Sequence, residues 1–142
     1  MRVLTDDEDE KFRKEVREKI GFHHEPAQGW EPLEIGEEYV VEYEQDEDRE
    51  SKALDAIGEL NDSLYILAFE SGQYVPKAKK TFKEDMKENV VEVSFDEVEC
   101  ILNDLVIVYV LPRNMEFIVL FDHDGNIHFS GKIISNAKRS FN

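Results

Sequence analysis

The chain has 142 residues, of which 41% are hydrophobic, including nine Phe, five Tyr and one Trp. This content is too high for a disordered acidic protein and suits a domain with a buried core. The formal net charge is −16 at pH 7, which disfavours anionic partners such as nucleic acid and anionic membranes.

The compartment is indicated by three negative observations. Cys100 is the single cysteine, so no disulfide can form within the chain. The first ten residues are acidic and carry no apolar run, so we expect no secretory signal. No apolar run reaches the length of a membrane span. These features predict a cytoplasmic protein.

The first predicted element is a helix over Asp6–Ile20. Thr5 followed by Glu8 is a capping-box spacing, in which each residue satisfies a free backbone amide of the first turn. Its apolar side chains recur every four residues: Phe12, Val16 and Ile20.

The next elements follow a loop, residues 22–36, whose Pro and Gly residues exclude regular structure. Glu37–Tyr43 predicts a short edge strand with its tyrosines and Val41 on one face. Asp46–Leu60 predicts a second helix with its acids facing outwards. Its inward positions are Ala53, Leu54, Ile57 and Leu60.

The middle of the chain alternates between strands and helices. Ser63–Glu70 is almost wholly apolar and predicts a buried strand, and Lys77–Glu88 predicts a cationic helix. Alternating apolar residues over Val91–Phe95 indicate another strand. For Asp96–Leu102 a helical turn and a continued strand both stay open.

The last forty residues predict an antiparallel meander. Its strands are Leu105–Leu111, Glu116–Phe121 and Ile127–Ile134, joined by turns at residues 112–114 and 122–126. We find no repeat and no linker, so residues 1–142 are expected to form a single domain. We predict an α+β fold, with N-terminal helices packed on one face of a mostly antiparallel sheet that ends in a C-terminal meander.

The segment whose composition is most unusual is strongly acidic. Between Glu31 and Asp62 it holds thirteen acids and two bases, a net charge of −11, whereas residues 63–142 hold twelve acids and nine bases. Such a concentrated negative field attracts cationic partners. The alternative explanation is that these acids form a solvated face that only keeps the protein soluble. The predicted partner-binding residues are Glu37, Glu38, Tyr39, Glu42, Tyr43, Glu44, Asp46, Glu47, Asp48, Glu50, Asp55 and Glu59.

One motif raises an enzymatic alternative. The apolar strand that ends in Asp122-x-Asp124-Gly125 resembles the first motif of haloacid-dehalogenase phosphatases, which implies a nucleophilic and a general acid–base aspartate beside magnesium. The Thr or Val expected after the glycine is Asn126 here. Asp-Gly and Gly-Asn also favour the positive φ angles of a tight hairpin. We therefore predict a hairpin turn, and no catalytic residue.

No metal or cofactor site is predicted. The four histidines, His23, His24, His123 and His128, lack the helical or recurring Cys/His spacing of metal sites. Cys100 has no histidine in its own predicted element and is expected to be a small buried side chain. The only basic cluster, within Lys77–Lys87, opposes the charge of the whole chain, so we expect no nucleic-acid binding.

The acidic layout resembles the small immunity proteins of bacterial toxin–immunity systems, including contact-dependent inhibition. Leu64–Glu70 and the hairpin Phe117–Lys132 are similar to bacterial domains that end with an apolar strand, an aromatic-Asp-x-x-Gly turn and a final strand. The turn here runs from Phe121 to Gly125, with Asp124 where Arg is common. This resemblance implies a non-enzymatic role with a cognate toxin as partner.

We therefore expect an immunity protein, or antitoxin, that neutralises a cationic toxin domain, most simply a nuclease, through its acidic surface. The alternative is a nucleic-acid mimic that inhibits a DNA-binding enzyme. An immunity protein should recognise one partner, whereas a mimic should bind several unrelated DNA-binding proteins.

Overall fold

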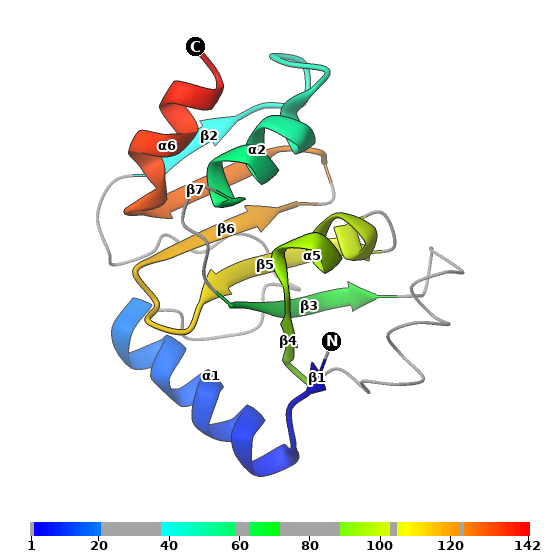
Figure 1. Ribbon diagram of the computed structural model, residues 1–142, viewed down its shortest axis with the longest axis vertical. Helices are drawn as coiled ribbons and strands as arrows, with labels where there is room; N and C mark the ends of the chain where they lie inside the picture. Colours follow the sequence, from blue (N-terminus) through cyan, green and yellow to red (C-terminus); the bar gives the residue numbers. More distant parts are fainter. Residues whose placement is uncertain (1, 21–37, 59–62, 72–88, 103–104, 123) are drawn as a thin grey trace.

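Seven strands in the part of the chain that the structure describes form one antiparallel sheet (Figure 1). The computed structural model describes residues 2–20, 38–58, 63–71, 89–102, 105–122 and 124–142. The strand order is β1-β4-β3-β5-β6-β7-β2, and every neighbouring pair is antiparallel. The strands are β1 Arg2–Val3, β2 Glu38–Val41, β3 Leu64–Ser71, β4 Val91–Val93, β5 Leu105–Pro112, β6 Phe117–Phe121 and β7 Ile127–Gly131.

Four helices in the described residues cover the two faces of this sheet. They are α1 Asp6–Ile20, α2 Arg49–Gly58, α5 Phe95–Leu102 and α6 Ile133–Ser140. Helices α2, α5 and α6 lie over one side of the strands, and α1 stands apart from them (Figure 1). The predicted α+β class, the antiparallel sheet and the meander β5-β6-β7 are confirmed. The helices were predicted on one face of the sheet, whereas α1 packs on the face opposite to α2, α5 and α6.

Both faces of the sheet carry a hydrophobic core. Side chains alternate along β3, so that Leu64 and Ile66 pack with α2, α5 and α6, while Tyr65 and Leu67 pack with α1. All five residues of β6 are buried. Burial on both faces explains why these strands read as continuous apolar runs and not as alternating ones.

Helix α1 follows its sequence signals closely. The backbone N–H of Glu8 donates to Thr5 Oγ1 at 3.2 Å, and the N–H of Thr5 donates to Glu8 Oε1 at 3.1 Å. The predicted capping box is thus present. Phe12 and Val16 are buried against the sheet, with the Phe12 and Tyr65 ring centroids 4.7 Å apart.

The last strand is shorter than the predicted range Ile127–Ile134. Strand β7 ends at Gly131, whose φ of +86° is unfavourable for other residues, and helix α6 begins at Ile133. A Cβ atom at Gly131 would lie 2.3 Å from the backbone oxygen of Glu116. Ile133, Asn136 and Ala137 then recur at helical spacing and are buried.

Other boundaries also shift. Helix α2 begins at Arg49, after a turn that contains Asp46, and not at Asp46 as predicted. Residues 96–102, left open between helix and strand, lie in α5, which begins at Phe95, a residue predicted to belong to the preceding strand. The predicted loop over residues 22–36 and the predicted helix over residues 77–88, with its lysines, lie outside the described residues.

Candidate partner-binding surface

The predicted acidic residues come together at one end of the sheet, on β2, on α2 and on the turns between them. Glu38 lies on edge strand β2, residues 42–48 form the connection, and Glu50 and Asp55 lie on α2. Glu37 and Glu59 fall outside the described residues. We call the described acids the acidic surface: Glu38, Glu42, Glu44, Asp46, Glu47, Asp48, Glu50 and Asp55.

Two of these acids have structural partners. Asp46 Oδ1 accepts the backbone N–H of Asp48 at 2.8 Å, and Asp46 Oδ2 pairs with Lys52 Nζ at 2.5 Å. The hydrogen bond from Lys52 is the main reason that the pKa of Asp46 is lowered. Glu38 Oε1 lies 2.7 Å from His128 Nδ1. These two carboxylates therefore hold the connection and the edge strand in place.

Five others have exposed side chains that make no hydrogen bond or ion pair with any described residue. They are Glu42, Glu44, Glu47, Glu50 and Asp55. Placing so many unpaired like charges together raises the electrostatic energy of the folded chain. No described residue pairs with these five carboxylates, which makes them candidates for contact with a ligand of opposite charge.

Tyr43 stands in the midst of these acids with 59% of its surface exposed. Among the described residues it is the one large hydrophobic side chain that is exposed. The guanidinium of Arg49 lies 4.4 Å from the centre of its ring, a cation–π arrangement. The Tyr43 backbone N–H donates to Asn126 Oδ1 at 2.9 Å. The ring is therefore exposed and yet held in position.

Tyr39, the other tyrosine predicted to bind the partner, is partly buried and packs against the hydrophobic core. Its ring contacts Phe129 and Phe141, with centroids 5.9 Å and 6.4 Å away, and Lys138 Nζ lies 5.9 Å from its centre. Tyr39 and Tyr43 were predicted to share one face of the strand. That prediction was wrong for Tyr43, because β2 ends at Val41.

A groove of about 360 Å³ borders the acidic surface between the start of α2 and α5. Leu54 and Leu102 contribute apolar side chains to it, and Glu99 of α5 adds a carboxylate that sequence analysis did not assign to the site. The residues around it are Glu47, Asp48, Arg49, Glu50, Ser51, Leu54, Glu99 and Leu102. An apolar wall beside carboxylates suits the stem and the charged head of a lysine or arginine side chain.

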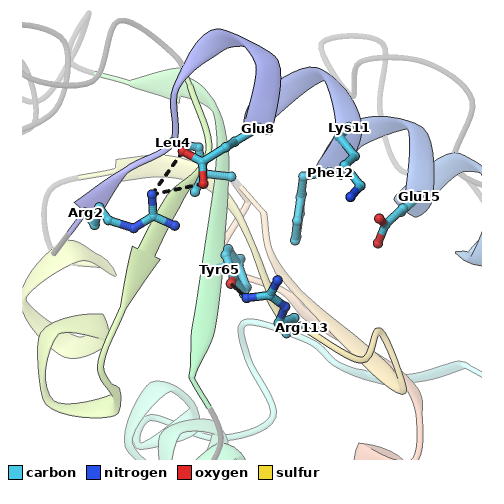
Figure 2. Close-up of a pocket in the computed structure, with 8 residues that line it drawn as sticks. All are labelled: Arg2, Leu4, Glu8, Lys11, Phe12, Glu15, Tyr65 and Arg113. Carbon is cyan, nitrogen blue, oxygen red and sulfur yellow. Dashed lines mark hydrogen bonds and ion pairs between the residues drawn. The ribbon is translucent and has the colours of Figure 1, made fainter.

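A second hollow, of about 160 Å³, lies between α1 and the sheet (Figure 2). Arg2 Nη1 pairs there with Glu8 at 3.0 Å, and Arg2 Nη2 pairs with Glu92 at 3.2 Å. Hydrogen bonds from Arg2 and from the Thr5 backbone lower the pKa of Glu8 to about 2.

The phenol at the base of the same hollow is also engaged. Tyr65 Oη donates to Glu92 Oε2 at 3.0 Å, and Arg113 Nη1 lies 3.5 Å from that hydroxyl. Burial is the main reason that the pKa of Tyr65 is raised, and its hydrogen bond to Glu92 adds to the effect. Arg2, Glu8, Glu92 and Tyr65 thus form hydrogen bonds and ion pairs with one another.

The Asp-x-Asp-Gly motif forms the β6–β7 turn, as predicted for a hairpin. Gly125 has a φ of +84°, and the backbone N–H of Asp122 donates to Asn126 O at 3.0 Å. Asp122 Oδ2 lies 2.8 Å from His128 Nε2. Sequence analysis did not assign His128 or Asn126 to the surface, because their partners are 90 and 83 residues away.

Comparison with protein-family models, curated proteins and solved structures finds no match for this chain. No helix among the described residues has the length and apolar character needed to cross a membrane. The same residues contain no group of three or more His, Cys, Asp or Glu side chains arranged to hold a metal ion.

Proposed function

We propose that this protein is an immunity protein that binds and neutralises a cationic toxin domain, with a nuclease as the leading candidate. The observation that carries the proposal is the group of five exposed carboxylates, without partners among the described residues, around the fixed, exposed ring of Tyr43. Aromatic anchors surrounded by polar groups are typical of binding hot spots.

The proposed mechanism is occlusion. A nuclease needs cationic side chains where it grips phosphate, and carboxylates from Glu42 to Asp55 can pair with those side chains and exclude the nucleic acid. Complementary charge speeds association by roughly 10-fold to 1,000-fold over that of a neutral surface. Tyr43 would then slow dissociation by packing against the toxin once the charges have brought the two proteins together.

Tyr39 has no part in this proposal. Its ring packs against Phe129 and Phe141, so it supports the edge strand that carries Glu38. The contact surface proposed here is therefore smaller than the set predicted from sequence, and it centres on the connection between β2 and α2.

The test is co-expression with any toxin-like C-terminal region that the gene immediately upstream encodes. Rescue of growth, together with co-purification as a one-to-one complex, is the expected result. A folded protein that neither rescues growth nor co-purifies would contradict the immunity role. Capture of several unrelated DNA-binding proteins would favour the nucleic-acid mimic instead.

A further inference from the structure

The β6–β7 turn is stabilised by the side chain of Asp122. Its Oδ1 accepts the backbone N–H groups of Asp124 and Asn126, both at 2.9 Å, while its Oδ2 contacts His128 Nε2 at 2.8 Å. Gly125 N–H donates to the Asp122 carbonyl oxygen at 3.2 Å. Both carboxylate oxygens of Asp122 are therefore used to fix the turn and the adjoining strand β7.

From this turn, three contacts reach the segment that carries the acidic surface. His128 Nδ1 lies 2.7 Å from Glu38 Oε1 at the start of β2. Asn126 Oδ1 accepts the backbone N–H of Tyr43 at 2.9 Å, within the connection. Arg49 Nε donates to the Gly125 carbonyl oxygen at 2.5 Å, at the start of α2. These contacts hold the segment at three places: on β2, in the connection between β2 and α2, and at the start of α2.

The turn requires glycine at position 125, and so does the close contact between the turn and the segment that carries Tyr43 and Arg49. A Cβ atom at that position would lie 2.5 Å from Tyr43 Cδ2 and 2.9 Å from Arg49 Nη2. Any other side chain would have to displace the ring or the guanidinium. Tyr43 can therefore take its observed position only because residue 125 has no side chain.

We propose that the β6–β7 turn is the positioning device of the partner-binding surface, with Asn126 and Asp122 as positioning residues that themselves make no contact with the partner. This inference rests on the proposed function and deepens it. The group it positions is Tyr43, and the matching group on the partner is a basic side chain whose apolar stem packs on the ring while its charge meets the neighbouring carboxylates. Fixing the ring beforehand reduces the entropy lost on binding.

The experiment compares Asn126→Ala with Asn114→Ala. Asn114 Oδ1 accepts the backbone N–H of Glu116 at 3.1 Å in the β5–β6 turn, so this control removes an equivalent hydrogen bond outside the acidic segment. Amide hydrogen exchange at Tyr43 reports the positioning directly. Loss of one hydrogen bond should speed that exchange about threefold to tenfold in Asn126→Ala and leave it unchanged in Asn114→Ala.

Binding is measured with octa-arginine as the cationic probe. We expect Asn126→Ala to raise its Kd about threefold to tenfold with an unchanged salt dependence, because every acid is still present. Asn126→Asp keeps an oxygen acceptor for the Tyr43 amide and should restore slow exchange, which separates positioning from a general loss of stability.

Unchanged exchange at Tyr43 in Asn126→Ala would overturn the inference. Faster exchange with an unchanged Kd would also overturn it, because the position of Tyr43 would then be irrelevant to binding, while the acidic surface would remain a valid interface. If the unmodified protein fails to bind octa-arginine, the result counts against the proposed function, and the exchange data alone decide whether the turn positions Tyr43.

Discussion

The two ends of the sheet use charge in opposite ways. At the β1–β4 end, Arg2 bridges Glu8 and Glu92, and Tyr65 donates to Glu92. At the β7–β2 end, the connection to α2 exposes carboxylates that have no partner among the described residues. Paired charges contribute to the stability of the chain that holds them, whereas clustered like charges oppose it. The second end is therefore the one that we propose to bind another molecule.

The largest expected effect comes from neutralising the unpaired acids. The substitutions are Glu42→Gln, Glu44→Gln, Glu47→Gln and Glu50→Gln. We expect the Kd for the cationic toxin domain to rise about 10-fold to 1,000-fold at low salt, mainly through slower association, because electrostatic steering is lost. Association rates measured over a series of salt concentrations would show this.

The matched control removes four acids from α1, where they are far from the proposed interface. These substitutions are Asp7→Asn, Glu10→Gln, Glu15→Gln and Glu18→Gln. The control changes the net charge by the same amount. If both sets weaken binding equally, total charge and not the acidic surface controls association.

The two tyrosines should separate binding from folding. Tyr43→Ala removes an exposed ring, so we expect the free energy of unfolding to change little while the toxin dissociates roughly 30-fold faster, as for a hot-spot residue. Tyr39→Ala removes packing against Phe129 and Phe141 and should cost about 2 to 3 kcal/mol of stability.

Urea denaturation and dissociation kinetics on both variants would test this prediction. A Tyr43→Ala protein that binds normally would remove the anchor from the proposed mechanism. A Tyr39→Ala protein with unchanged stability would mean that the ring contacts of Tyr39 do not support the edge strand.

The charge pairs at the α1 end predict a defined response to acid. The pKa of Glu8 is lowered from 4.5 to about 2, chiefly by Arg2, so its stabilising effect is complete above about pH 4.5 and is lost as the pH falls towards 2. Both side chains are exposed, so the effect is modest: Arg2→Gln should lower Tm slightly at pH 6, and the difference should shrink as the pH falls towards 2.

Thermal melts of both proteins between pH 6 and pH 2 would measure this window. Lys132→Gln is the control, because it breaks one exposed ion pair, with Glu116, whereas Arg2 pairs with both Glu8 and Glu92. A constant difference in Tm between Arg2→Gln and the unmodified protein at every pH would show that Arg2 acts through packing and not through charge.

The smallest effect is that of salt on stability. Raising NaCl from about 0.05 M to about 0.5 M shortens the screening length and should raise Tm by a few degrees, because like charges in the acidic surface repel one another less. The variant with four neutralised acids should gain less. An equal gain in both proteins would place the repulsion elsewhere in the chain.

Local signals predicted most of the fold. The capping box at Thr5 and Glu8, and the apolar runs of β5 and β6, depend on neighbours in sequence, and the helix and both strands lie where they were expected. Helix α6 was missed because Ile127–Ile134 also fits an alternating strand. Gly131, with its positive φ, was the available sign that the strand ends.

The candidate surface was predicted only in part, because charge is visible in a sequence while contact is not. The acids were identified by their density alone. The contacts of His128 with Glu38, and of Asn126 with Tyr43, join segments that the fold of the sheet brings together, since β2 pairs with β7. No short-range pattern encodes such contacts.

The fastening of the acidic segment has a consequence for how its specificity can change. The residues that hold it, Asp122, Asn126 and Arg49, are different from those that face outwards, such as Glu42 and Glu47. If the proposed function holds, outward positions could therefore be exchanged to suit a new partner while the framework stays as it is. In this respect the surface is organised like the hypervariable loops of an antibody, in which a rigid support carries replaceable contact residues.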